Sequence, residues 1–228
     1  MVAIERPARL SDIAAEHLRE RILRGTYPPG SPLSQETLAQ EFSISRTPLR
    51  DALKALERDG LVELDASGSA SVVDISPEDA QDLLRIRETI DGVAAGRAAA
   101  LPADRRLALA EVLEPILKEL NASAEVEDRY RFRVADSRFH VAILKHCQSK
   151  QLNNCKAFVH GTALSIYSSR TPSPGHLLRS ARHHGRIAEA VLAGDIDGSV
   201  QVARDHVHKA YEYYYGTGRP AAEANGHA

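Results

Sequence analysis

The stretch SISRTPLRDALKALERDGL, residues 43–61, has the pattern that decides the fold of the N-terminal third of the chain. Ser45 is a favourable N-cap for a helix, and Pro48 is tolerated in its first turn. The leucines recur at helical spacing and form an apolar row that packs the helix down. Four polar side chains are then left on or near the outward side: Arg46, Thr47, Arg50 and Lys54. The pattern predicts a helix that is buried on one side and offers basic and hydroxyl groups on the other.

Two further helices are expected on the N-terminal side of this stretch. SDIAAEHLRERILRG, residues 11–25, has a favourable cap at Ser11 and a stop at Gly25. Its apolar side chains are expected near one face: Ile13, Leu18 and Ile22. The prolines and glycine of TYPPGSPL, residues 26–33, cannot continue a helix and predict a short extended connection. A second helix is then predicted from near Ser34.

Two β-like runs, residues 61–64 and 71–73, follow the third helix and flank a Gly/Ser turn that contains Gly68. A short helix, a turn, a capped helix with Arg and Thr in its first turn, and a hairpin form the layout of a winged helix-turn-helix. In that layout Arg reads guanine edges or clamps phosphate, and Thr contacts either. The alternative is a small helical domain whose charged helix is only solvated.

Composition sets the class of protein that the chain can form. It has 228 residues, 43% of them hydrophobic and 26% charged, which allows one large or two smaller globular domains. There is no run of about 18 apolar residues and no secretory leader, so we expect a cytoplasmic protein without a membrane span. Cys147 and Cys155 lack paired zinc spacing and fit a reducing compartment. A formal net charge of −2 argues against a nonspecific polyanion binder but permits a local basic patch.

A second domain is expected over residues 76–215, after a winged helix-turn-helix over residues 1–75. Ser76 is its first helix cap and Pro77 its first helical residue. The remainder reads as long amphipathic segments without a convincing strand, which predicts an all-α bundle of about six helices and a mainly α fold. The segments are broken near residues 101–102, 121–125, 149–154, 171–175 and 194–197. Residues 216–228 are small, polar and Gly/Pro-bearing, which predicts a disordered tail.

Nine of the ten histidines lie at or beyond position 140. In DSRFH, residues 136–140, Asp136 and His140 lie one helical turn apart, the spacing of two metal ligands but also of a simple hydrogen-bonded pair or of a solvated face. Helical phase turns His184 and His206 inward on two other helices. Buried imidazoles and a carboxylate without partners are costly, so they form a hydrogen-bonded network or share a cation. Three nitrogens and one oxygen suit Zn²⁺, Ni²⁺ or another borderline divalent ion.

Residues 10–75 resemble the winged-helix DNA-binding domain of GntR-type transcriptional regulators. The resemblance rests on a G-x-x-x-P-G-x-x-L opening, then LA, SRTPLRDAL and LERDGLV. It implies that Arg46, Thr47 and Arg50 contact DNA, with the Gly68 turn near the minor groove. There are two departures: Glu36 and Thr37 stand where members often have a basic residue, and the wing tip ASGSAS lacks the usual Arg or Lys.

The rest of the chain resembles the all-helical effector domain of the FadR-type branch, called FCD. DSRFH, an inward His opening HGRIAEAVLAGD and a last His 22 positions later have its pattern. The resemblance implies a divalent metal bound by four residues: Asp136, His140, His184 and His206. Arg87, in LLRIRETID, matches an Arg that lines the effector pocket and pairs with a carboxylate ligand; the alternative is a surface Arg paired with Asp91. The usual Gly-Asn after the FH helix is Gln148-Ser149 here, which concerns the shape of the pocket.

Three functional hypotheses follow. The first is a homodimeric regulator that binds an inverted repeat in double-stranded DNA and responds to a small organic acid at the metal pocket. The second makes the metal itself the signal. The third is a metalloenzyme, but we find no HExxH, no nucleophile elbow and no carboxylate placed as a general base, so an enzyme is not expected.

Overall fold

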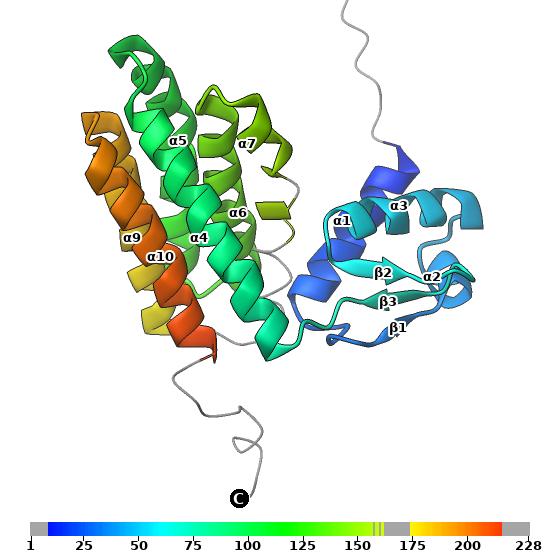
Figure 1. Cartoon of the computed structure of the whole chain (residues 1–228). Coiled ribbons are helices and arrows are strands. Elements are labelled where there is room, and N and C mark those ends of the chain that lie inside the picture. Colours follow the sequence, from blue (N-terminus) through cyan, green and yellow to red (C-terminus); the bar gives the residue numbers. More distant parts are fainter. Residues whose placement is uncertain (1–8, 157, 160, 162–173, 216–228) are drawn as a thin grey trace, which may run out of the picture.

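The computed structural model describes residues 9–156, 158–159, 161 and 174–215; the predicted tail lies outside these residues. The elements form two groups that lie side by side (Figure 1). The first group holds three helices and three strands: α1 (Leu10–Leu23), β1 (Pro32–Leu33), α2 (Gln35–Glu41), α3 (Arg46–Arg58), β2 (Val62–Leu64) and β3 (Ala70–Val72). The described part of the second group holds six helices and no strand: α4 (Pro77–Ala99), α5 (Ala103–Glu125), α6 (Arg129–His146), α7 (Lys150–Asn154), α9 (Pro174–Ala193) and α10 (Ile196–Tyr215). The predicted mainly α fold, a winged helix-turn-helix followed by a helical bundle, is confirmed.

The three strands form one antiparallel sheet in the order β1-β3-β2. Pro32 pairs with Ser71, and Val62 pairs with Val72. β1 comes from the proline-rich connection, because proline keeps the chain extended and cannot continue a helix. Gly68 turns the chain between β2 and β3 at a φ of +84°, which a residue without Cβ adopts at little cost. β2 and β3 are therefore the predicted wing.

α1 differs from its prediction at its N-terminus and on one face. The helix begins directly after Arg9, so Ser11 lies inside its first turn and is not its cap. Ile13 was expected in the core but is 45% exposed, because the buried stripe of α1 passes through Ala14 and Leu18 instead. The packing of the apolar side chains of α1 thus outweighs the preference of Ser11 for the N-cap position.

α2 and α3 begin where the sequence places them. The Ser34 hydroxyl accepts a hydrogen bond from the Thr37 amide at 3.3 Å and caps α2. Ser45 stands at the N-cap of α3, although its side chain makes no capping bond there. The expected apolar row of α3 is fully buried: Leu49, Leu53 and Leu56 are each 0% exposed. Burial of this row fixes which side of α3 faces outward.

The bundle differs from its prediction at two chain breaks. α5 continues through the expected break at residues 121–125 and ends at Glu125, because Leu120 and Ala124 pack into the core. α7 forms inside the break expected at residues 149–154, and the Ser149 hydroxyl caps it. The break expected at residues 171–175 lies largely outside the described residues. No helix in the described part of the chain is long and apolar enough to cross a membrane.

α6 is the helix that contacts both groups of elements. The Arg133 guanidinium, 6% exposed, donates a hydrogen bond to the Leu23 carbonyl at the end of α1 at 2.7 Å. The Tyr130 hydroxyl donates to the Glu16 carboxylate at 2.7 Å, and Val134 packs against the apolar core of the first group. The first half of α6 therefore joins the winged domain to the bundle.

α4 and α10 approach closely because α4 has two glycines where the helices meet. A Cβ built on Gly96 would lie 2.6 Å from Val200 Cγ2, and one on Gly92 would lie 2.7 Å from Arg204 Cγ. Both distances are shorter than van der Waals contact, so any side chain here must push the helices apart. In contrast, a Cβ at Gly185 in α9 would have no neighbour within 4 Å.

We therefore expect opposite effects of the same substitution at two helical glycines. Gly96→Ala should lower the free energy of unfolding, because overpacking costs about 1–3 kcal/mol and exceeds the gain of about 1 kcal/mol in helix propensity. Gly185→Ala should raise it by about 0.5–1 kcal/mol, since only the propensity gain applies. Urea unfolding would measure both values, and a rise for Gly96→Ala would contradict the packing argument.

Candidate metal centre and nucleic-acid interface

Three helices bring four inward side chains to one point in the bundle. Asp136 and His140 come from α6, His184 from α9 and His206 from α10, and all four are at most 4% exposed. One ligand atom from each lies within 4.8 Å of the other three. The sequence predicted these four residues from helical phase, and the structure brings them together. His208, which was expected to face outward, is exposed.

Hydrogen bonds outside the cluster orient two of the imidazoles. His184 Nδ1 lies 2.8 Å from the Ser180 carbonyl, which can only accept, so this nitrogen donates. His140 Nδ1 lies 3.1 Å from Asp91 Oδ2 and donates to that carboxylate in the same way. In the neutral ring the proton is then on Nδ1 and the lone pair is on Nε2. Both Nε2 atoms turn into the cluster, as metal-bound histidines commonly do.

When the imidazoles are neutral, the atoms that converge in the cluster can all act as acceptors. His140 Nε2 and His184 Nε2 are 3.3 Å apart, and Asp136 Oδ1 is 3.1 Å from His184 Nε2. Within the described residues, His206 Nε2 and Asp136 Oδ2 are buried without a hydrogen-bond partner. Lone pairs at these distances repel unless a proton or a cation lies between them. The donor set therefore fits a divalent ion with nitrogen and oxygen ligands, such as Zn²⁺ or Ni²⁺.

The electrostatics of the cluster favour the protonation states that metal binding requires. Burial raises the pKa of Asp136, but the hydrogen bond and charge of His184 outweigh this, and the pKa falls far below its ordinary value. Burial lowers the pKa of His140, which Asp91 only partly offsets. Burial also lowers the pKa of His206 well below that of a free imidazole. At neutral pH the carboxylate is ionised, and both of these imidazoles are neutral.

Arg87 and Asp91 form a charged layer behind the ligands. Arg87 is 0% exposed; its Nε donates to Asp91 Oδ2 at 3.1 Å, and its Nη2 lies 3.9 Å from Asp136 Oδ2. Arg87 pairs with Asp91, as the alternative interpretation predicted, but the pair lies in the interior of the bundle and not on its surface. Burial raises the pKa of Asp91, but the charges of His140 and Arg87 outweigh this effect. The pKa of Asp91 is therefore lower than its ordinary value. The role of Asp91 in orienting His140 was missed by the sequence analysis, which treated it only as a partner of Arg87.

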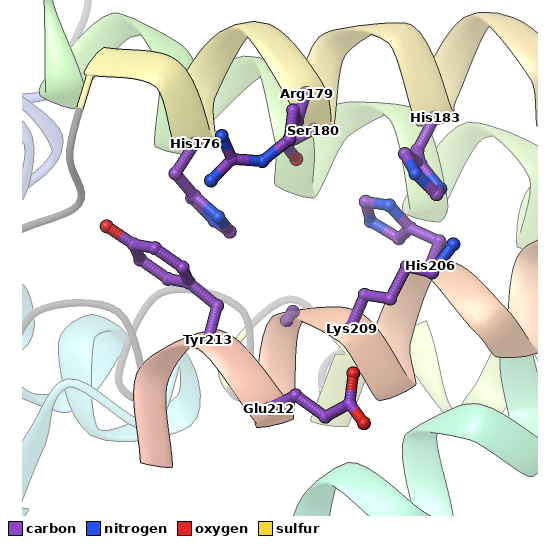
Figure 2. Close-up of a pocket in the computed structure, with 9 residues that line it drawn as sticks. His176, Arg179, Ser180, His183, His206, Lys209, Glu212 and Tyr213 are labelled. Atoms are coloured by element: carbon purple, nitrogen blue, oxygen red, sulfur yellow. The ribbon is translucent and has the colours of Figure 1, made fainter. Parts of the chain in front are cut away.

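A hollow of about 320 Å³ lies between α9 and α10 and reaches His206 (Figure 2). This volume is within the range of small-molecule sites. His183 lines the hollow beside His206, with 6.2 Å between the ring centroids. Of the four clustered residues, His206 is the one that lines this hollow.

The expected DNA-contacting side chains lie along the exposed side of α3. Arg46, Thr47, Arg50 and Lys54 are all exposed. In the described part of the chain no ion pair involves the three cations among them, whereas two arginines of α1 and the arginine at its C-cap are paired with carboxylates. Unpaired cations at the start of a helix that projects outward are available to phosphates and base edges.

The wing tip has the opposite charge. Asp65 accepts hydrogen bonds from the amides of Ser67 and Ser69 at 2.8 and 2.9 Å. The hydrogen bond from the Ser67 hydroxyl and these amide bonds lower the pKa of Asp65, which stays ionised at neutral pH. Gln35 Nε2 donates to the Gly68 carbonyl at 2.5 Å and ties the turn to α2. A fixed negative charge beside Gly68 disfavours a phosphate contact by the wing tip itself.

Comparisons with known proteins match both halves of the chain. The model of "Bacterial regulatory proteins, gntR family" matches residues 10–72, and that of the "FCD domain" matches residues 82–209. The HTH-type transcriptional regulator YdhC of Bacillus subtilis (strain 168) is 26% identical over 201 residues, 86% of this chain and 87% of YdhC. The gluconate operon transcriptional repressor of the same strain is 30% identical over 131 residues, 58% of this chain and 52% of the repressor. The structure of Escherichia coli McbR/YncC shares the fold, with a TM-score of 0.73 and 20% identity over 91% of this chain and 98% of that one.

The geometry of the cluster predicts one divalent ion per chain, removed by loss of any ligand. His184→Ala should abolish stoichiometric Zn²⁺ or Ni²⁺ binding in a competition titration with a chromophoric chelator. Asp91→Asn should weaken metal binding about 10- to 100-fold, because an asparagine is not a charged acceptor for the Nδ1 proton of His140. His208→Ala is the matched control, since His208 pairs with Glu88 and Glu212 outside the cluster. Metal binding by the His184→Ala protein equal to that of the control would contradict the site.

Proposed function

Because this chain belongs to the GntR family of bacterial regulatory proteins and has an FCD domain, we propose that its operator affinity is controlled by a small carboxylate at a metal-containing pocket. A DNA-binding transcriptional regulator is what the family membership itself indicates. The observation that carries the finer proposal is the buried set of converging acceptors: Asp136, His140, His184 and His206. We propose that the protein binds its operator in the cytoplasm.

DNA binding is assigned to the exposed side of α3 and to the backbone of the wing. Arg46, Thr47 and Arg50 occupy its first two turns and Lys54 the third, so a helix inserted into the major groove presents the first three to base edges. Lys54 lies farther along the same side and is assigned to a phosphate. The wing turn at Gly68 is assigned to the minor-groove side, where its backbone and not a basic side chain would contact the DNA.

The charge of the metal cluster supports an anionic effector. Imidazoles that bind a metal are neutral, so the ionised groups at a metal-bound cluster are Asp91, Asp136 and Arg87, which together carry one negative charge. A divalent ion reverses this to one positive charge in a buried site, which a single carboxylate neutralises. The ion would supply a Lewis-acidic position for a carboxylate oxygen, as Zn²⁺ and Ni²⁺ both can. We assign Arg87 to the effector site, where it keeps the ligand carboxylate of Asp136 ionised and in place.

α6 provides a physical connection between the proposed effector site and the DNA-binding domain. Asp136 and His140 lie on the same continuous helix as Tyr130 and Arg133, which contact α1. An effector that binds two positions of α6 with different affinity would shift the winged domain between two arrangements. A difference of a few kcal/mol is sufficient for a switch of this kind.

A homodimer is part of the proposal. Winged helices that read an inverted repeat do so as two-fold dimers. α4 has two exposed apolar side chains seven residues apart on one face, Ile86 and Val93, which are 50% and 46% exposed. This face is available to a second copy of the chain, and analytical ultracentrifugation would give the assembly state.

Selection from a random duplex-DNA library at fixed salt concentration tests the proposed function. We expect an enriched inverted repeat, and we expect Arg50→Ala to reduce the affinity for it by about 1–3 kcal/mol. Arg58→Ala is the control, because it removes an exposed Arg from the last turn of the same helix. No enrichment by the metal-loaded protein would refute the proposal. If metal removal changes affinity for the enriched duplex and no carboxylate does, the metal itself is the signal.

The α6 connection predicts that metal binding in the bundle reaches α1. Adding Zn²⁺ should slow amide hydrogen exchange in α1 of the wild-type chain, as measured by mass spectrometry. Arg133→Met should reduce this effect while leaving Zn²⁺ affinity unchanged, because it removes the hydrogen bond to Leu23. Arg131→Met is the matched control, since Arg131 pairs with Glu119 on the surface of the bundle and does not contact α1. Equal protection of α1 in both variants would show that α6 does not transmit the signal through Arg133.

A further inference from the structure

The hollow between α9 and α10 has two differently built ends (Figure 2). His206 and His183 stand at one end, the end that adjoins the metal cluster. His176, Arg179 and Tyr213 stand at the other end, toward the start of α9 and the end of α10. The side chain of a metal ligand is therefore part of the wall of a pocket that extends away from the metal.

Each end of the hollow has one cation. The Lys209 ammonium lies toward His183 and His206, whereas the Arg179 guanidinium lies toward His176 (Figure 2). Neither cation takes part in an ion pair within the described chain. The one carboxylate at the rim, Glu212, lies 3.5 Å from His208 Nε2 on the outer side of α10. With Arg179 and Lys209 against the single carboxylate of Glu212, the described wall of the hollow has an excess of positive charge.

The wall between the cations is largely uncharged. The His176 ring stacks on Tyr213 with 3.7 Å between centroids and 16° between planes. Burial, with the nearby charge of Arg179, lowers the pKa of His176 to about 4, so the ring is neutral at neutral pH. Two flat neutral rings beside a cation suit a ligand with an apolar carbon chain and an anionic end.

We propose that Arg179 binds a second anionic group of the effector, so that the effector is a short dicarboxylate and not a monocarboxylate. This inference rests on the proposed function, which places the first carboxylate at the metal beside His206 and Lys209. Arg179 lines the same hollow of about 320 Å³ as His206 and Lys209. A single ligand with a short carbon chain between two carboxylates can therefore contact both ends of it.

The guanidinium is suited to this role because it is planar and donates two parallel hydrogen bonds to a carboxylate. Arg179 is exposed, and within the described residues no ion pair holds its guanidinium. It is thus a specificity-determining residue, and it lies outside the set of metal ligands.

The test is isothermal titration calorimetry of the full-length, Zn²⁺-loaded protein with butyrate, succinate and glutarate. We expect at least one dicarboxylate to bind about tenfold more tightly than butyrate, the contribution of a charge-assisted bond. Arg179→Gln should remove this advantage without changing butyrate affinity or Zn²⁺ stoichiometry, and Arg179→Lys should restore part of it. Arg182→Gln is the matched control: it removes an exposed charge from the same helix but not from the hollow.

The outcomes separate this inference from the proposed function. Equal affinities for butyrate and the dicarboxylates, or an advantage that survives Arg179→Gln, would overturn the inference alone. Failure of every carboxylate to bind would overturn both. A dicarboxylate advantage that depends on Arg179, without any effect on binding to the selected DNA, would support the second subsite and refute control of the operator.

Discussion

The bundle depends on one electrostatic constraint, the convergence of acceptor atoms from three helices on a single buried point. His140 and His184 direct their protons outward to Asp91 and Ser180, which leaves two lone pairs and a carboxylate oxygen facing one another. Repulsion among these atoms in a medium of low dielectric constant would work against the packing of α6, α9 and α10. A cation shared by these atoms would remove that repulsion and hold the three helices together.

The charged side chains of the winged domain are unevenly distributed. α3 has its cations free on the outward side, while the wing tip keeps Asp65 ionised through hydrogen bonds within its own turn. In the proposed function, contacts that distinguish bases would therefore be concentrated in the first turns of α3, and the wing would add little electrostatic attraction. The proposed dimer would gain most of its added affinity from the second copy of α3, since each half-site alone would offer few phosphate contacts.

The sequence predicted the four candidate ligands because each lies on an amphipathic helix whose phase is set by its own apolar residues. Phase says which side of a helix faces inward, and Asp136, His140, His184 and His206 all obey it. It does not say which helices meet, and so the role of Asp91 and the hollow between α9 and α10 were not predicted. Leu18 and Ile22 are buried as predicted, but Ile13 was misplaced because Ala14 and Ala15 take the inward positions of the first turns of α1.

One departure from the family pattern has a structural explanation. Gln148 replaces the usual glycine after α6, yet its φ of +53° keeps the left-handed backbone that glycine favours. The Arg97 guanidinium donates to the carbonyls of Cys147 and Gln148 at 3.3 and 3.4 Å and holds the end of the helix. The backbone conformation is thus retained without the glycine that normally favours it, and a comparison of amino-acid sequences alone would miss this.

Because α6 is continuous, the size of a movement that it could transmit to α1 can be estimated. Arg133 and His140 are seven residues apart, about 10 Å along the helix axis. If α6 tilts as a rigid lever about the metal by about 6°, Arg133 moves by about 1 Å, because an α-helix bends little over two turns. A hydrogen bond of 2.7 Å lengthened by that amount is broken. A rotation smaller than most domain motions would therefore be enough to break this hydrogen bond between α6 and α1.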